Sequence, residues 1–135
     1  MQVEKTEAVL IRSSDDVAMA RHIVRQHALQ MGFSLVDQTK VVTAASELAR
    51  NIVVHGGSEG RVLVEQLSDG FRRGLRLVFE DNGPGISNIP LAMKDGYTTG
   101  GGLGIGLGGA KRLMNDFDIA TKVGEGTRIS VTKWK

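Results

Sequence analysis

Apolar residues recur along this chain with two spacings, which divide it into predicted helices and strands. Spacings of three and four residues are typical of a helix with one buried side. They predict one helix from Ser13 or Ser14 to about Met31 and a second from about Leu35 to about Val54. Gly32 follows the first helix and Gly56-Gly57 the second, as glycine often does where a helix ends.

Alternation of apolar and polar residues predicts five strands, because successive side chains of a strand point to opposite faces. Two pairs of these strands flank the turn signals Ser68-Asp69-Gly70 and Gly124-Glu125-Gly126, which predicts two hairpins. Pro90–Tyr97 is a candidate for a short helical turn, and a third helix is expected over Leu103–Asn115. The predicted strands are Val3–Ile11, Arg61–Leu67, Gly74–Asp81, Phe117–Val123 and Thr127–Trp134.

The two hairpins imply a mixed but mainly antiparallel sheet, and the helices then cover one of its faces. The predicted fold class is therefore α+β, a two-layer α/β sandwich. No internal repeat is visible, and 135 residues fit one domain with one core. We expect a single domain over residues 1–135.

Composition narrows the class of protein. A hydrophobic content of 41% and a charged content of 24% are ordinary for a soluble globular protein. The chain has no cysteine for a disulfide or a thiolate metal site, which favours a cytoplasmic location. We expect no membrane segment, because no apolar run approaches roughly 20 residues and the first residues lack the pattern of a secretion signal. A scattered net charge of +2 with 4% aromatic residues disfavours nucleic acid as a partner.

Glycine is the unusual component: there are 18, and eight of them lie between Gly96 and Gly109. Such a cluster forms either a flexible linker or a tightly curved loop. A loop is favoured because the cluster leads directly into the third predicted helix. Free amides of the loop and the positive end of the helix dipole then form a cradle for an anion, with phosphate expected. Gly104–Gly109 formally matches the dinucleotide-binding motif GxGxxG, but no strand precedes it and no second βαβ unit follows. A Walker A motif is excluded because Lys111 is preceded by Ala110 and followed by Arg112 rather than by Ser or Thr.

Glu47, Asn51 and His55 are spaced four residues apart on the second predicted helix, so they share one stripe. The stripe borders the apolar face, where carboxylate and amide groups need partners. Asn51 offers a neutral oxygen ligand for Mg²⁺, and Glu47 offers a general base. The alternative is an ordinary polar edge with a Glu47–Arg50 ion pair.

Asp81 falls on the same strand face as Leu77 and Phe79, so a carboxylate reaches the edge of the core. There it needs a donor, and an adenine amino group is a natural one. Gly83 and Gly85 have no Cβ, so a flat base can approach the backbone closely. The alternative is a plain hairpin turn, since Asn-Gly is a common turn pair.

Thr127 shares a strand face with Ile129 and Val131, so its side chain is expected to point inward. Its hydroxyl could contact the base or Asp81. The alternative is a hydrogen bond between this hydroxyl and the backbone. The residues named above fall into four motifs along the chain, and the order and spacing of the motifs are more specific than any motif alone. They are Glu47 with Asn51, Asp81–Gly85, Gly100–Leu107 and Gly124–Thr127.

The four motifs resemble those of the Bergerat-fold ATP-binding family, which includes gyrase, heat-shock protein 90, histidine kinases and the MutL repair proteins. The lid between Ile86 and Gly102 is short, and there is no dimerisation or phosphoacceptor histidine domain. In this the chain is similar to the small serine kinases of bacterial sigma-factor partner switching. Three segments resemble most closely the kinases that switch the stressosome: Ser46–Ile52, Asp95–Gly100 and Lys111–Met114.

The resemblance implies ATP and Mg²⁺ as cofactors and a role for each matched residue. Asp81 accepts the adenine amino proton with Thr127 nearby, and Asn51 ligates Mg²⁺. Glu47 orients or deprotonates the incoming hydroxyl, in a reaction that depends mainly on positioning and charge. Ile105 departs from many relatives, but its backbone amide is retained. The other implied nucleotide contacts are Gly83, Gly85, Ile86, Gly101, Gly102, Leu103, Gly104, Ile105 and Gly106.

Kinases of this kind phosphorylate a serine or threonine of a STAS-domain antagonist or scaffold protein. Once released, they bind and activate a downstream effector, typically a phosphatase. Two alternatives stay open: an anti-sigma factor kinase that mainly sequesters a sigma factor, and a non-catalytic module that senses nucleotide. The presence of Glu47 disfavours the second alternative, because a module without catalysis has no need of a base.

Overall fold

The computed structural model describes residues 1–55, 59–85, 89, 93 and 106–135. Over these residues the helices and strands have the predicted types and the predicted order. Their bounds are β1 Gln2–Ile11, α1 Ser14–Gln30, α2 Leu35–His55, β2 Gly60–Ser68, β3 Arg73–Asp81, α4 Gly106–Leu113, β4 Asp116–Lys122 and β5 Gly126–Trp134.

The third predicted helix is shorter than expected at its C-terminal end, because α4 stops at Leu113 rather than at Asn115. Asn115 instead joins the sheet: its amide donates to the Thr132 carbonyl at 2.9 Å, and its side-chain oxygen accepts from the Trp134 amide at 2.7 Å. The predicted start of this helix, at 103–105, lies outside the described residues. Of the predicted turn over Pro90–Tyr97, only Met93 is described, and its amide donates to the Ile89 carbonyl at 2.9 Å.

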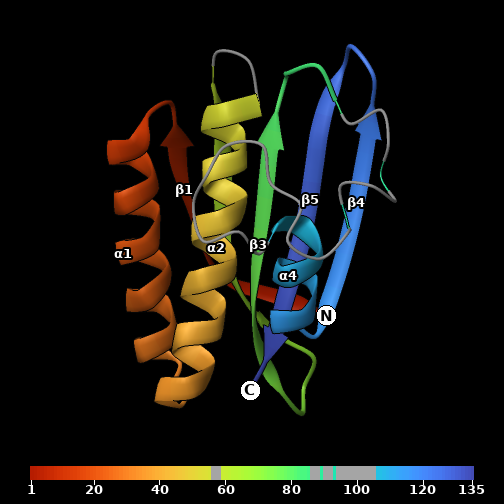
Figure 1. Cartoon of the computed structure of the whole chain (residues 1–135). Coiled ribbons are helices and arrows are strands. Elements are labelled where there is room, and N and C mark those ends of the chain that lie inside the picture. The colour runs from red at the N-terminus through yellow and green to blue at the C-terminus, as the bar shows by residue number, and fades with distance from the viewer. Residues whose placement is uncertain (56–58, 86–88, 90–92, 94–105) are drawn as a thin grey trace.

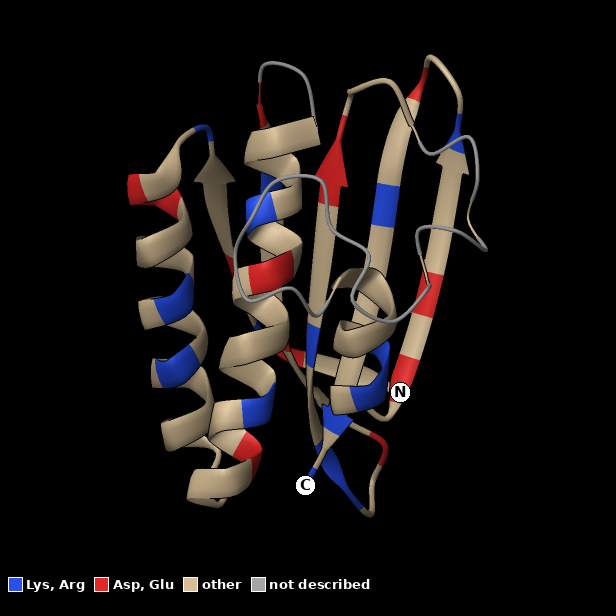
Figure 2. Ribbon diagram, viewed as in Figure 1, with Lys and Arg blue, Asp and Glu red and all other residues tan. Residues whose placement is uncertain are grey.

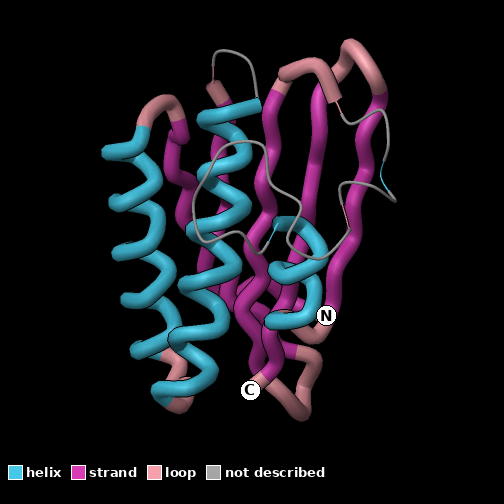
Figure 3. Tube along the Cα trace, viewed as in Figure 1, coloured by secondary structure: helices cyan, strands magenta, loops and turns pink. Residues whose placement is uncertain are grey.

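The sheet has the order β1-β2-β3-β5-β4, and each pair of neighbouring strands is antiparallel. The helices α1, α2 and α4 lie in one layer against one face of this sheet (Figure 1, Figure 3). The predicted two-layer α+β sandwich is therefore confirmed. β3 and β5 pair directly although α4 and β4 lie between them in the sequence, and this pairing brings two of the four motifs together.

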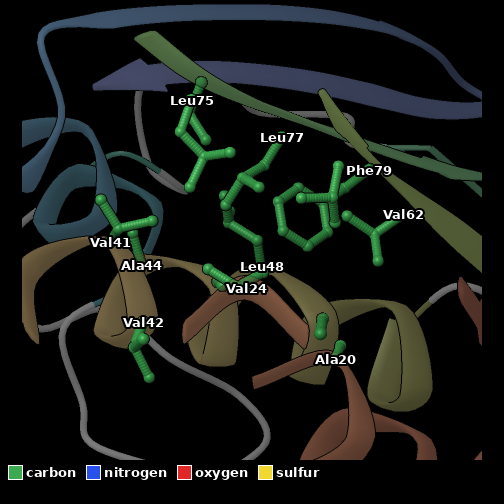
Figure 4. Packing of buried hydrophobic residues seen from close by; sticks show 14 of the residues in the cluster. Ala20, Val24, Val41, Val42, Ala44, Leu48, Val62, Leu75, Leu77 and Phe79 are labelled. Carbon is green, nitrogen blue, oxygen red and sulfur yellow. The ribbon is translucent and has the colours of Figure 1, made fainter. Parts of the chain in front are cut away.

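The core lies between the helices and the sheet, and β3 runs through its centre. Leu75, Leu77 and Phe79 of β3 point toward the helices and are fully buried (Figure 4). Leu48 of α2 packs into the same cluster. Burial of an apolar side chain of this size contributes about 1.5–3 kcal/mol. These contacts hold α2 and the end of β3 in a fixed relation, and both carry predicted site residues.

His27 fixes α1 to the sheet through two hydrogen bonds at a buried position. Its Nε2 lies 2.8 Å from a carboxylate oxygen of Glu7 on β1, and its Nδ1 lies 2.9 Å from the side-chain nitrogen of Gln66 on β2. Because an amide nitrogen only donates, Nδ1 accepts this bond and Nε2 donates to Glu7. The bonds hold the outer helix layer in place beside α2.

Charged residues of both signs are interspersed over the described helices and strands (Figure 2). Several form exposed cross-strand or i to i+4 pairs, such as Arg61 with Glu80 at 3.4 Å and Arg12 with Asp16 at 3.2 Å. Pairs of this kind contribute little to stability, in the range of about 0–1 kcal/mol. No helix among the described residues is both long and apolar enough to cross a membrane.

Candidate functional site

Asp81 is the last residue of β3 and lies at the end of the buried strand face. Its Oδ1 accepts a hydrogen bond from the Gly83 amide at 2.8 Å. Within the described part of the chain, the structure gives its Oδ2 no hydrogen-bond partner. One oxygen of this half-buried carboxylate is hydrogen-bonded and the other is available, so the group is suited to accept a hydrogen bond from a ligand.

The segment after Asp81 is fixed against the turn between β4 and β5. Gly124 donates its amide to the Pro84 carbonyl at 2.8 Å. Gly85 has a φ of +77°, and a Cβ built there would lie 2.5 Å from the Lys122 carbonyl oxygen. Gly85 is thus in close contact with the protein backbone. The alternative of a plain hairpin at Asn82-Gly83 is excluded, because β3 pairs with β2 and β5.

Thr127 lies directly opposite Asp81 in the β3–β5 ladder. Its hydroxyl is 2.9 Å from the hydroxyl of Thr121 on β4. The side chain is half-buried, and its flanking partners on the strand face, Ile129 and Val131, are buried. The hydroxyl is therefore satisfied by a side chain rather than by the backbone, and it lies beside the open carboxylate.

Gly126 is a site residue whose role is not predicted by the sequence. Its φ is +108°, and a Cβ built there would lie 2.1 Å from the Asp81 carbonyl oxygen. Only glycine allows β5 to approach the end of β3 this closely. The Gly-Glu-Gly-Thr motif gave a signal for the position, but the close contact with Asp81 depends on a strand pairing that the motif does not reveal.

Glu47 lies near the middle of α2 and is only 3% exposed. Its carboxylate accepts a hydrogen bond from the backbone amide of Gly106, the first residue of α4. Burial raises the pKa of Glu47 above its ordinary value, while the Gly106 amide and the nearby Arg50 guanidinium act in the opposite direction. The Arg50 guanidinium therefore acts on the Glu47 carboxylate, as the alternative of a polar edge expects, and its effect on the pKa is the smallest of the three.

The Glu47 carboxylate lies at the N-terminus of α4, where the sequence predicted an anion. Gly106 has a φ of +64°, and its amide belongs to the predicted phosphate cradle. A carboxylate on that amide shows that this helix end accommodates a negative group. The other predicted cradle residues and one base contact lie outside the described residues: Gly101, Gly102, Leu103, Gly104, Ile105 and Ile86.

Asn51 lies one helical turn beyond Glu47 and is half-buried, and His55 ends α2 and is exposed. The structure therefore places Glu47 and Asn51 on one stripe of α2, while Asp81 and Thr127 lie together on the sheet. Among the described residues, no group of three or more His, Asp or Glu side chains gathers as a metal site would. An amide oxygen such as that of Asn51 is nevertheless an ordinary Mg²⁺ ligand when phosphate oxygens supply the rest.

A cavity of about 340 Å³ lies between α1 and α2, and Glu47 is one of its lining residues. No pattern in the sequence predicts this cavity, because it depends on how the two helices pack. Two arginines, one from each helix, contribute to its wall. The lining residues are Ser14, Val17, Ala18, Arg21, Ser46, Glu47, Arg50, Val53 and Val54.

The fold and the site together define an ATP-binding domain built from helices on one face of an antiparallel sheet. The chain belongs to the family of histidine kinase-, DNA gyrase B- and HSP90-like ATPases, whose family model matches residues 36–135. The resemblance seen in the four motifs is thereby confirmed.

Individual proteins within this family are similar to the chain over most of its length. The chain is 46% identical over 126 residues to the serine/threonine-protein kinase RsbT of Bacillus subtilis (strain 168), covering 93% of this chain and 94% of that protein. It is 34% identical over 128 residues to an anti-sigma F factor of Clostridium kluyveri, covering 91% of this chain and 89% of that one. The solved RsbU and RsbW domains of Rv1364c from Mycobacterium tuberculosis share the fold, with a TM-score of 0.69 and 19% identity over 97% of this chain and 33% of that chain.

Proposed function

We propose that this protein is an ATP-dependent serine/threonine protein kinase of a bacterial partner-switching module, acting in the cytoplasm. The observation that carries the proposal is the buried Glu47 carboxylate at the N-terminus of α4. A base in that place lies where a phosphate cradle is expected, and the 46% identity to the kinase RsbT supports the same activity. The substrate is a serine or threonine of a STAS-domain antagonist or scaffold protein, and the released kinase then activates an effector such as a phosphatase.

The nucleotide is recognised at the end of β3. Asp81 accepts a hydrogen bond from the adenine amino group through Oδ2, while the Gly83 amide donates to its Oδ1. Thr127 lies beside it on β5, and Gly83, Gly85 and Ile86 are the expected contacts of the base, with the Cβ side of Gly85 facing the Lys122 backbone. Gly101, Gly102, Leu103, Gly104, Ile105 and Gly106 supply amides to the phosphates.

Mg²⁺ neutralises charge on the phosphates when it is bound. Asn51 would hold it through its side-chain oxygen, a neutral ligand of the kind that Mg²⁺ accepts. Half-burial on the Glu47 stripe of α2 fits Asn51 for this role.

Glu47 positions the acceptor hydroxyl and receives its proton. The hydroxyl oxygen forms a bond to the γ-phosphorus, the bond from that phosphorus to ADP breaks, and the proton passes to Glu47. The carboxylate has two oxygens, so it can accept a hydrogen bond from the hydroxyl while it keeps the one from the Gly106 amide. Its pKa, raised by burial, favours acceptance of the proton.

The cavity between α1 and α2 is the route by which the acceptor residue reaches Glu47. Glu47 is one of its lining residues, together with residues of both helices. Arg21 and Arg50 in its wall favour a segment that carries negative charge, including the phosphorylated product. A serine-bearing loop of a folded partner fits a cavity of this size.

A second candidate function is that of an anti-sigma factor kinase, which sequesters a sigma factor as its main task. The 34% identity to an anti-sigma F factor favours this candidate. A pull-down against RNA polymerase holoenzyme separates the two functions: retention of a sigma factor supports the anti-sigma role, and its absence supports the switch kinase.

One experiment tests the proposed function directly. The protein is incubated with ATP, Mg²⁺ and each STAS-domain protein encoded nearby, and the phosphate is located by mass spectrometry. We expect transfer to one serine or threonine, and its loss in Glu47→Ala. Intact ATP binding with no transfer to any candidate would instead support a nucleotide-sensing module.

A further inference from the structure

Three side chains form a row across three neighbouring strands at the edge of the site. Thr127 on β5 lies opposite Asp81 on β3, and on its other side it lies opposite Thr121 on β4. Directly opposed residues in a sheet present their side chains on the same face. Thr121 belongs to none of the four motifs, and this row connects it to the site.

The hydrogen bonds of the row favour one direction of donation. Thr121 donates its hydroxyl proton to the carbonyl oxygen of Gly126 at 3.1 Å, because a carbonyl oxygen only accepts. Either hydroxyl can donate in the 2.9 Å contact between the two threonines, and we infer that the donor is Thr127, because the single proton of Thr121 is directed at Gly126. The Thr127 oxygen is left with lone pairs and with no proton for a ligand.

The Gly126 carbonyl is a firm anchor for this arrangement. Gly126 is buried with a φ of +108°, and its backbone is packed against the Asp81 carbonyl oxygen. Movement of the anchor would therefore move Asp81 as well. The direction of the two hydroxyl bonds is thus set by the backbone of the site itself.

We propose that Thr121 is a positioning residue that holds the Thr127 hydroxyl as a hydrogen-bond acceptor. The edge of the pocket then carries two acceptors side by side, the Asp81 carboxylate and the Thr127 oxygen. Such an edge selects a nucleobase that brings an exocyclic amino group, because a base without that donor covers these half-buried acceptors and leaves them unpaired. The proposal rests on the nucleotide site proposed above, and it adds a residue that acts through Thr127.

The test compares ADP with purine riboside 5′-diphosphate, which lacks the exocyclic amino group. Calorimetry gives the ratio of the two dissociation constants for the wild type, Thr121→Val and Thr121→Ser. Thr121→Val removes the hydroxyl and keeps the shape, while Thr121→Ser keeps the hydroxyl and serves as the matched control. We expect the preference for ADP to fall about tenfold in Thr121→Val, the equivalent of about 1.4 kcal/mol or one hydrogen bond, and to be retained in Thr121→Ser.

Thr127→Val should reduce the preference by a similar factor, and the double variant should show no further loss because both changes remove one interaction. Equal weakening of both ligands in Thr121→Val, or an unchanged ratio, overturns the positioning role and leaves the nucleotide site standing. Failure of the wild type to bind ADP overturns the nucleotide site, and the positioning role with it. Thermal unfolding of each variant verifies that the fold is intact.

Discussion

The carboxylate of Glu47 accepts a hydrogen bond from the backbone amide of Gly106, which joins the middle of α2 to the first residue of α4. Two motifs that are far apart in the sequence thus meet at one contact. The contact gives the buried carboxylate a donor and gives the N-terminus of α4 an anion. It also makes Glu47 the residue shared by the expected phosphate cradle and the cavity between α1 and α2.

Glu47→Ala should retain nucleotide binding and lose phosphoryl transfer. The carboxylate is expected to act on the acceptor hydroxyl rather than on the base, so ADP affinity should change little. Transfer should fall by a factor of about 10²–10⁴, the range for a positioned general base. Calorimetry with ADP and the rate of phosphate incorporation into a STAS-domain substrate measure the two effects. Full transfer activity in this variant would remove Glu47 from the mechanism.

Glu47→Gln should stabilise the fold increasingly as the pH rises. Because burial raises the pKa of Glu47 above its ordinary value of 4.5, the folded protein binds this proton more tightly than the unfolded chain does. The contribution of the group to stability is complete below pH 4.5 and is lost as the pH rises through the raised pKa. Glutamine does not titrate, so its contribution to stability does not fall as the pH rises. Its side-chain oxygen can still accept a hydrogen bond from the Gly106 amide.

Urea unfolding of the wild type and Glu47→Gln from acid to neutral pH measures this difference. The free energy of unfolding of the variant, relative to the wild type, should increase with pH. A difference that stays constant or shrinks across this range would show that burial does not disfavour the charged form of Glu47.

Gly126→Ala should destabilise the protein and weaken ADP binding together. A Cβ at this position would lie 2.1 Å from the Asp81 carbonyl oxygen, so the end of β3 must move. The φ of +108° alone costs about 1–3 kcal/mol for a residue with a side chain. Gly124→Ala is the matched control, because it has a φ of +82° with nothing within 4 Å of a Cβ.

Urea unfolding and ADP calorimetry of the two alanine variants provide the comparison. Gly126→Ala should lose more stability than Gly124→Ala, and only Gly126→Ala should lose affinity for ADP. Equal effects of the two substitutions on both measurements would mean that the close approach to Asp81 has no role in the site.

The sequence was sufficient for the layers of the fold but not for several contacts of the site. Alternation in Gly74–Asp81 placed Asp81 at the end of a buried strand face, and helical spacing placed Glu47 and Asn51 on one stripe. These are local consequences of the strand and helix periods. The motif order then indicated the family, which the family model confirms.

Contacts between elements distant in the sequence were not predictable in this way. The bond from Gly106 to Glu47 depends on the packing of α4 against α2, and the Thr121–Thr127 bond depends on the register of β4 and β5. The reason for glycine at position 85 also differs from the expected one, which was the approach of a flat base. The atoms closest to a Cβ at this position belong to the Lys122 backbone. Periodicity fixes the direction of a side chain, but only tertiary pairing fixes its partner.

Asn51→Ala should abolish the effect of Mg²⁺ on nucleotide affinity. Its amide oxygen is the expected metal ligand from the protein, so ATP affinity in Mg²⁺ should fall to the value measured with EDTA. Affinity in EDTA itself should match that of the wild type, which serves as the internal control. Titrations of ATP with and without Mg²⁺ measure both values, and retention of the full Mg²⁺ effect would exclude Asn51 as the ligand.

The most direct test of the nucleotide site is the affinity of Asp81→Asn for ADP, measured by calorimetry beside the wild type. Asparagine has nearly the same shape but offers an amide in place of a carboxylate, and a donor there opposes the adenine amino group. We expect the wild type to bind ADP and binding by Asp81→Asn to be undetectable at the same concentrations. Equal affinity in the two proteins, with both folded, would contradict the claim that Asp81 recognises the adenine base.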